Sequence, residues 1–235
     1  MNQFVACDMH VHTNYSHDCN TNLHDIKTIA KKKGLIIAIT DHNRIGGSLA
    51  AHAMGIPTIP AIEVTTKNNK DILVYFHAFE HLIEFYKQTI KPALNPGIIW
   101  QAKTTLSELD VLKAAKHYNA FTSLAHPYAP LNKKSAGLDN NILQQLDAIE
   151  VMNFAMSKKA NQKAAQLCDK TNKAHTAGSD SHHPSTIGKV TVRTNASSPQ
   201  EFLTETMQGL GIVVGHPRKN KDLYAKLKHY LATRG

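Results

Sequence analysis

The sequence contains few cysteines and no long apolar segment. Its three cysteines are Cys7, Cys19 and Cys168, and no CxxC pair occurs, which argues against a disulfide framework and against a zinc knuckle. No run approaches the roughly 20 apolar residues that a membrane-spanning helix needs. The N-terminus lacks the basic-then-apolar pattern of a secretory signal peptide. We therefore expect a cytoplasmic protein with no membrane partner, and nothing indicates an obligate protein partner.

Acidic residues are also scarce. The 235 residues include 18 Asp and Glu against 27 Lys and Arg, which gives a formal net charge of +9. Much of the excess falls in lysine-rich segments such as 31–33 and 219–228, where a solvated helix face is the simplest interpretation. A positive field also attracts phosphorylated molecules and nucleic acid. Few aromatic residues lie among the lysines, however, which disfavours a dedicated nucleic-acid platform.

Apolar runs that alternate with helical patterns make up most of the chain. The strand-like runs lie at 4–7, 35–39, 56–64, 71–79, 120–125, 148–152, 174–177, 188–193 and 211–214. The helical patterns lie at 23–33, 48–54, 81–100 in part, 107–118, 141–146, 158–170 and in the basic C-terminal segment. About seven strand–helix units predict a parallel sheet with right-handed crossovers. We expect an α/β fold with one domain over residues 1–235, built as a TIM-like (β/α)7 barrel.

Histidine is abundant, with 15 residues, and many histidines follow an apolar run. His10 and His12 alternate at the end of the first run, so they share one face of a strand. Similar strand-end positions hold His42, Glu63, His77, His126, Asp180 and His182. The carboxyl ends of strands in such a barrel meet on one face, where active sites lie. Burying so many titratable groups is costly without a cation, so the pattern predicts a metal site.

Four motifs in order then carry a resemblance to a known family. They are Asp8–Thr13 with Ser16–Asp18, Ile39–Asn43, Ala125–Pro127 and Gly178–His182. The set is similar to the four motifs of the polymerase and histidinol phosphatase (PHP) family, with Glu63 and His77 at the intervening positions. The resemblance covers most of the chain from Asp8 to Pro184, and residues 185–235 would supply closing strands and a C-terminal helix.

The resemblance implies a distorted seven-stranded barrel with two or three divalent metal ions. His10, His12, Glu63 and Asp180 would hold the first ion. Glu63, as a bridge, would hold the second ion together with His77 and His126. The third ion would be held by Asp18, His42 and His182. Cys19 stands where the family usually has glycine, so occupancy of the third site and a ligand role for this thiol are open. The donor set suits zinc, manganese or iron.

The function that follows from this resemblance is metal-dependent hydrolysis of a phosphoester. A metal-activated hydroxide would attack phosphorus in line, with Glu63, Asp180 and His182 as catalytic residues. The substrate would be a phosphomonoester, a nucleotide or a short oligonucleotide. Two alternatives stay open: an amide or deamination hydrolase of a related barrel type, and a non-catalytic metal-binding regulatory module.

Residues that could assist the metal ligands are less clearly marked. Arg44, Arg193, Arg218 and His183 are candidate substrate contacts, because arginine grips phosphate oxygens bidentately. Asp8 and Asp41 precede ligating histidines, and each would either orient an imidazole or hydrogen-bond the backbone. Glu150 follows a strand and could likewise support a ligand or only be satisfied at the rim.

Overall fold

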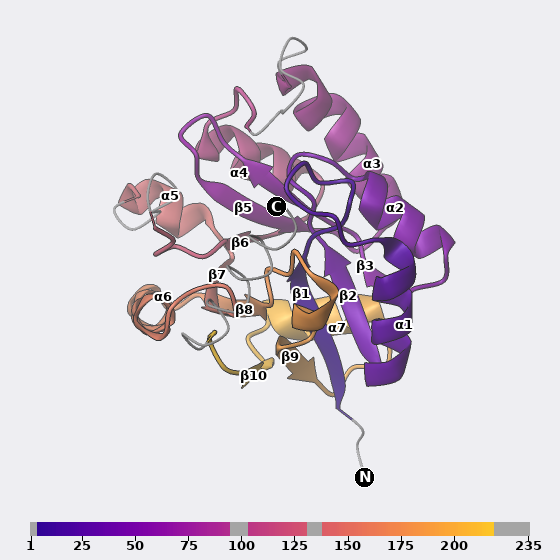
Figure 1. Ribbon diagram of the computed structural model, residues 1–235. Coiled ribbons are helices and arrows are strands. Elements are labelled where there is room, and N and C mark those ends of the chain that lie inside the picture. Colours follow the sequence, from indigo (N-terminus) through magenta and orange to yellow (C-terminus); the bar gives the residue numbers. More distant parts are fainter. Residues whose placement is uncertain (1–3, 95–102, 131–137, 219–235) are drawn as a thin grey trace, which may run out of the picture.

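Two five-stranded sheets form the centre of the protein (Figure 1). The structure is a computed structural model, which describes residues 4–94, 103–130 and 138–218. The first sheet has the order β10 (Ile212–Gly215), β9 (Val190–Thr194), β1 (Val5–Val11), β2 (Leu35–Ile39) and β3 (Thr58–Ile59). The second has the order β4 (Ala61–Thr65), β5 (Asp71–Tyr75), β6 (Phe121–Leu124), β7 (Ala148–Asn153) and β8 (Ala174–Gly178).

Strand direction departs from the all-parallel expectation in both sheets. β1, β2 and β3 are parallel, as are β6, β7 and β8. β5 runs antiparallel to both β4 and β6, and Thr65 pairs with Asp71. β9 and β10 are also antiparallel to their neighbours. At the edge where the parallel strands end, β5 therefore presents its first residue instead of its last.

The two sheets meet at the carboxyl ends of their strands. Isolated bridges join Val11 to Ser181 and His42 to Glu63. Gly178 lies so close to β1 that an added Cβ would sit 2.4 Å from the Cβ of His10, so only glycine fits there. The described strands thus form two sheets with local contacts between them, and the closed (β/α)7 barrel expected from the sequence is not confirmed.

Most predicted helices are present, and their ends follow local chemistry. α1 (Leu23–Lys33) begins at Asn22, whose side chain accepts from the Asp25 N–H, and ends at Gly34 with φ 62°. Ser107 and Asp110 form a capping box on α4 (Glu108–His117). The remaining α-helices are α2 (Gly46–Ala53), α3 (Phe79–Phe85), α5 (Asn140–Gln145), α6 (Lys158–Thr171) and α7 (Pro199–Met207).

Short helical segments complete the described part of the chain. They are the π-helical η1 (Tyr86–Ile90) and the 3-10 helices η2 (Lys91–Ala93) and η4 (Pro184–Thr186). The predicted C-terminal helix lies outside the described residues, as does the part of the predicted 81–100 segment that follows residue 94. None of the described helices is long and apolar enough to cross a membrane.

The hydrophobic core has one inner and two outer parts. The inner part lies between the sheets and includes Met9, Tyr75 and Phe202. One outer cluster packs α1 and α2 against β1 and β2, and the other packs α3, α4 and α6 against the second sheet (Figure 1). The buried Tyr75 hydroxyl donates to the Met9 carbonyl at 2.9 Å and so links β5 to β1 across the inner core. One such bond contributes about 1 kcal/mol.

Candidate metal centre

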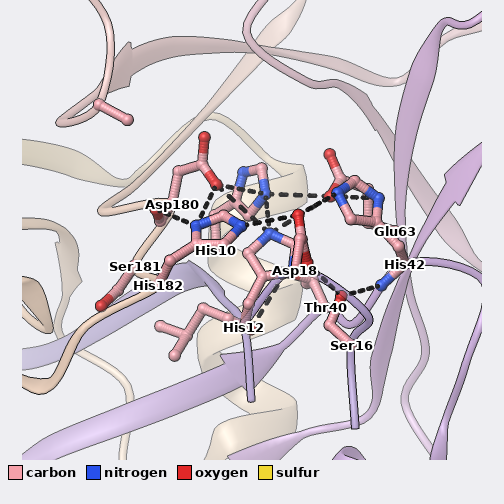
Figure 2. A network of polar contacts seen from close by, with 12 residues as sticks. His10, His12, Ser16, Asp18, Thr40, His42, Glu63, Asp180, Ser181 and His182 are labelled. Carbon is pink, nitrogen blue, oxygen red and sulfur yellow. Dashed lines mark hydrogen bonds and ion pairs between the residues drawn. The ribbon is translucent and has the colours of Figure 1, made fainter. Parts of the chain in front are cut away.

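His10 and His12 meet two carboxylates at the end of β1 (Figure 2). Their Nε2 atoms are 3.1 Å apart. The Glu63 Oε2 atom lies 3.5 Å from the first of these nitrogens and 3.3 Å from the second. Asp180 Oδ1 lies 3.6 Å and 3.3 Å from the same two nitrogens. The donor atoms of His10, His12 and Glu63 lie close enough together to hold one ion, and Asp180 lies beside both histidines.

A second group lies toward solvent and contains the three predicted ligands of the third ion. Asp18 Oδ2 is 3.0 Å from His182 Nε2 and 3.4 Å from His42 Nε2. The His12 and His182 rings are stacked, with centroids 4.4 Å apart, so this group adjoins the first. The Asp18 and His182 side chains are 33% and 25% exposed, whereas His10, His12 and Glu63 are fully buried. Solvent therefore reaches the centre from the side of Asp18 and His182.

The third group also contacts Glu63 and contains an unpredicted aspartate. His126 Nε2 is 3.3 Å from Glu63 Oε1 and 3.7 Å from Asp71 Oδ2. His42 Nδ1 is 3.1 Å from Glu63 Oε2. His42, Glu63 and Asp71 are all buried, and their donor atoms lie close enough together to hold an ion.

His77 is the one predicted ligand that the structure does not bring to the cluster. It lies in a half-buried bend beyond the end of β5, and no potential ligand group among the described residues includes it. Because β5 is antiparallel, Tyr75 at its end pairs with the first residues of β4 and β6, so His77 lies at the opposite edge of the sheet. Asp71, at the start of β5, reaches the centre instead. This corrects the expectation for His77.

A signal for the reversal is present in the sequence. Residues 67–70 read Lys-Asn-Asn-Lys, and Asn69 adopts φ 57° in the turn that joins β4 to β5. The Thr66 N–H donates to the Lys70 carbonyl at 2.9 Å and closes the turn. Asparagine tolerates the left-handed conformation, and such pairs favour short antiparallel hairpins. A hairpin prediction here would have identified Asp71 as the strand-end residue.

The chemistry of Glu63 fits a bound cation. Both of its oxygens are buried and make no hydrogen bond of good geometry to the described residues, although imidazole nitrogens surround them. Burial raises the pKa of this carboxyl, but His42 and His10 outweigh that effect and hold it well below its usual range. The Asp180 pKa is lowered in the same way, against burial, chiefly by His10. Two ionised buried carboxylates need positive charge beside them, which a divalent ion would supply.

Glu150 orients two of the clustered histidines. Its Oε1 is 2.9 Å from His10 Nδ1, which directs the opposite nitrogen of that ring into the centre. Its Oε2 accepts hydrogen bonds from the His126 N–H at 2.8 Å and from the Asn153 side chain at 3.0 Å. The same Asn153 amide reaches Asp180 Oδ2 at 3.3 Å. Glu150 therefore supports the ligands, which was one of the two roles left open for it.

Backbone strain accompanies two of the clustered residues. His126 has φ 25° and Asp180 has φ 50°. Such conformations are costly for residues other than glycine and persist where the surroundings fix them. The Asp180 N–H donates to the His10 carbonyl at 2.8 Å, and Glu150 holds the His126 N–H, so each strained residue is fixed by a contact with the centre.

Asp8 and Asp41 hold the backbone of the loops that carry the site. Asp8 accepts from the N–H groups of Ser179 at 2.8 Å and Gly188 at 2.7 Å, and burial still raises its pKa to about 6. Asp41 accepts from the N–H and the hydroxyl of Thr13, both at 2.7 Å, and burial raises its pKa to about 7. Asp8 and Asp41 therefore hydrogen-bond the backbone, which was one of the two roles left open for them. Among the described residues, neither bonds an imidazole ring.

Cys19 takes no part in the potential ligand groups found among the described residues. The thiol is buried, and its Sγ accepts from the Thr21 N–H at 3.4 Å. Ser16 instead links the loop to the centre, because its hydroxyl donates to Asp18 Oδ1 at 2.7 Å and accepts from the His42 N–H at 3.3 Å (Figure 2).

The candidate substrate contacts lie in different places. Arg44 is exposed two residues after His42, and His183 is exposed directly after His182. The Arg218 N–H donates to the Phe154 carbonyl at 2.9 Å, just beyond the end of β7. Arg193 pairs with Ala6, at the amino end of β1, and so lies at the edge of the sheet opposite to the centre. The structure corrects the expectation that Arg193 could contact a substrate there.

Comparison with known proteins identifies the class of fold. Residues 158–209, which include Asp180 and His182, match the family model described as PHP-associated. An uncharacterized protein of Methanocaldococcus jannaschii is 26% identical over 165 residues, covering 63% of this chain and 82% of that protein. A two-domain protein of Bacteroides vulgatus that contains a PHP-like metal-dependent phosphoesterase matches with a TM-score of 0.64 and 18% identity, covering 91% of this chain and 65% of that one. The lesion-specific endonuclease PfuEndoQ of Pyrococcus furiosus matches with a TM-score of 0.66 and 19% identity, covering 90% of this chain and 57% of that one.

These likenesses give the chain the mixed α/β fold found in PHP-like metal-dependent phosphoesterases. The match over residues 158–209 adds a PHP-associated segment to this fold. Both findings support the resemblance first indicated by the four motifs.

Replacing Asp71 should weaken metal binding, whereas replacing His77 should not. Asp71→Asn removes a buried negative charge beside Glu63 and His126, so we expect at least ~10-fold weaker binding at one site. His77→Ala is the matched control from the other end of β5. The measurement is metal content after dialysis against graded concentrations of Mn²⁺. Loss of metal in His77→Ala and full retention in Asp71→Asn would contradict this assignment.

Metal binding should also strengthen as pH rises. An imidazole must lose its proton before its nitrogen binds a metal ion. Burial lowers the pKa of His10, His126 and His182, but neighbouring carboxylates outweigh burial and raise each pKa above the ordinary value. Protons thus compete with metal up to pH values above about 6.5. Calorimetric titrations with Mn²⁺ at about pH 6, 7 and 8 should show rising affinity and proton release. An affinity that does not change with pH would contradict the prediction.

Proposed function

We propose that this chain is a metal-dependent phosphoesterase. The observation that carries the proposal is the convergence of histidines and carboxylates from several strand ends on the buried Glu63 carboxylate. The fold supports it, because the neighbours in structure include a PHP-like metal-dependent phosphoesterase and an endonuclease. Both of those activities break phosphoester bonds.

Two or three divalent ions would be held by overlapping sets of ligands. His10, His12, Glu63 and Asp180 would hold the first ion. Glu63, His126 and Asp71 would hold the second ion. Asp18, His42 and His182 would hold the third ion. Mixed nitrogen and carboxylate donors suit zinc, manganese or iron.

Bound divalent ions would supply Lewis acidity, which neutralises charge on the phosphoryl oxygens and activates water at neutral pH. Glu63 sets the spacing of the ligand groups, because Oε2 faces His10 and His12 while Oε1 faces His126. Asp180 joins the inner group to the outer one, since its Oδ1 lies 3.3 Å from His12 and 3.6 Å from His182.

Asp18 and His182 would be the first of these side chains to meet a substrate, because they are the ones that solvent reaches. Their Oδ2 and Nε2 atoms are 3.0 Å apart, so the pair keeps a fixed orientation toward the entrance. We assign His182 a role in orienting the phosphoryl group at this point. Arg44 and His183, both exposed beside clustered residues, would extend the contact to the rest of the substrate.

The substrate class that we propose is a phosphomonoester, a nucleotide or a short oligonucleotide. The net charge of +9 favours polyanionic substrates. The lesion-specific activity named for the Pyrococcus furiosus neighbour is consistent with nucleic-acid chemistry in this fold.

We also propose that residues 1–235 form one domain in which β1, β2 and β4–β8 correspond to the seven strands of the family's distorted barrel. Support comes from the inner core, to which all seven strands contribute side chains.

The test is hydrolysis by the metal-loaded protein of aryl phosphate monoesters and diesters, deoxynucleotides and a short single-stranded oligonucleotide. Wild type should release phosphate or cleave the oligonucleotide, and chelation should abolish the activity. Glu63→Gln should lower the rate by about 100-fold or more, since removing charge stabilisation at the reacting group costs that much. His77→Ala is the control and should keep the wild-type rate.

The alternatives predict different outcomes in the same experiment. An amide or deamination hydrolase would release amine or ammonia from amide and nucleobase substrates while leaving every phosphoester intact. A metal-binding regulatory module would bind the ions tightly and turn over none of these compounds. Thermal unfolding of Glu63→Gln separates lost chemistry from lost structure, because a folded but inactive variant is the expected result.

A further inference from the structure

One exposed aromatic residue lies in the loop that carries Asp18 of the candidate metal centre. Among the described residues, the exposed large apolar side chains are Phe4, Tyr15, Leu210 and Ile212. Phe4 precedes β1, and Ile212 pairs with Arg193 near the amino end of β1, with Leu210 just before it. These three lie far from the strand ends that build the site. Tyr15, 43% exposed, lies instead in the loop that follows the carboxyl end of β1.

Tyr15 stands at the side from which solvent reaches the centre. Asp18, three residues further along the same loop, is one of the two partly exposed clustered side chains. Ser16, the residue after Tyr15, bonds both the Asp18 carboxylate and the His42 N–H (Figure 2). The Tyr15 backbone is thus tied to the outer ligand group through its direct neighbour.

The Tyr15 ring is held in place before any substrate binds. Its N–H donates to the Thr13 hydroxyl oxygen at 3.1 Å, and that hydroxyl donates to the buried Asp41 carboxylate at 2.7 Å. The ring also packs on Gly46 at the start of α2, where an added Cβ would lie 2.6 Å from Cδ1. A ring fixed in this way loses little conformational entropy when a planar group stacks on it.

We propose that Tyr15 is a specificity-determining residue that stacks on the nucleobase of a nucleotide or single-stranded nucleic-acid substrate. The inference rests on the proposed function and narrows its substrate class. Every base has a π face, so stacking on tyrosine tolerates all sequences. The exposed Arg44 adds positive charge two residues before Gly46, on which the Tyr15 ring packs.

The test compares two ligands that differ only in the base. Binding of deoxyadenosine 5′-monophosphate and deoxyribose 5-phosphate to the metal-loaded protein is measured by equilibrium dialysis, and their hydrolysis is measured in parallel. Tyr15→Ala should bind the nucleotide roughly 5- to 150-fold more weakly, which corresponds to the usual contribution of one stacked base. Its binding of the sugar phosphate should not change. Tyr15→Phe should retain nucleotide binding, and Phe4→Ala, the exposed aromatic at the other end of β1, serves as control.

The outcomes separate this inference from the proposed function. If Tyr15→Ala weakens the binding of both compounds equally, or weakens the binding of neither, the stacking role would be overturned. Wild-type protein that binds the two ligands equally well would overturn it too. Base-dependent binding that Tyr15→Ala removes, in a protein that hydrolyses neither compound, would support Tyr15 and contradict only the phosphoesterase proposal.

Discussion

The burial of the Glu63 carboxylate is the constraint on which the rest of the site depends. A carboxylate without exposure to water is costly unless positive charge lies next to it. Imidazoles from β1, from the segment after β2 and from the segment after β6 surround this one group. Each nitrogen is close enough to share a cation with Glu63, and none makes a hydrogen bond of good geometry to it. The side chains around Glu63 are therefore arranged as ligands of a metal ion.

Backbone contacts hold this arrangement in place. Asp8 ties β1 to the segments around Ser179 and Gly188, and Asp41 ties the end of β2 to the loop at Thr13. Glu150 then fixes the ring of His10 and the backbone of His126. These three buried carboxylates therefore place loops and side chains, while the clustered carboxylates face the centre. Strain at His126 and Asp180 persists because such contacts hold those residues from outside.

The sequence predicted the α/β class, most helices and most of the clustered residues. That success has a physical basis, because an apolar run followed by histidine marks a strand end whichever sheet the strand joins. The prediction of parallel strands was wrong for β5, since a run such as residues 71–75 has the same pattern whether it runs parallel or antiparallel. His77 was therefore expected where Asp71 lies. The division into two sheets and the pairing of Glu150 with His10 depend on contacts between distant segments, which periodicity does not encode.

The geometry of the centre explains why the Glu63 carboxylate can belong to several ligand sets. Glu63 Oε2 lies beside His12 and Oε1 lies beside His126, so the inner group and the group with His126 share this carboxylate. His12 stacks on His182 and thereby joins the inner group to the exposed one. The centre is thus continuous from the buried Glu63 to the exposed Asp18. A substrate that enters beside Asp18 would meet a surface whose charge is set by all three groups.

Binding of divalent ions by this cluster can be tested with an anomalous-scattering map of crystals grown with Mn²⁺. We expect a strong peak bounded by His10, His12, Glu63 and Asp180, with further density beside Asp71 and His126 or beside Asp18 and His182. A map with no peak within bonding distance of Glu63, from protein shown to be folded and soaked at saturating Mn²⁺, would contradict it.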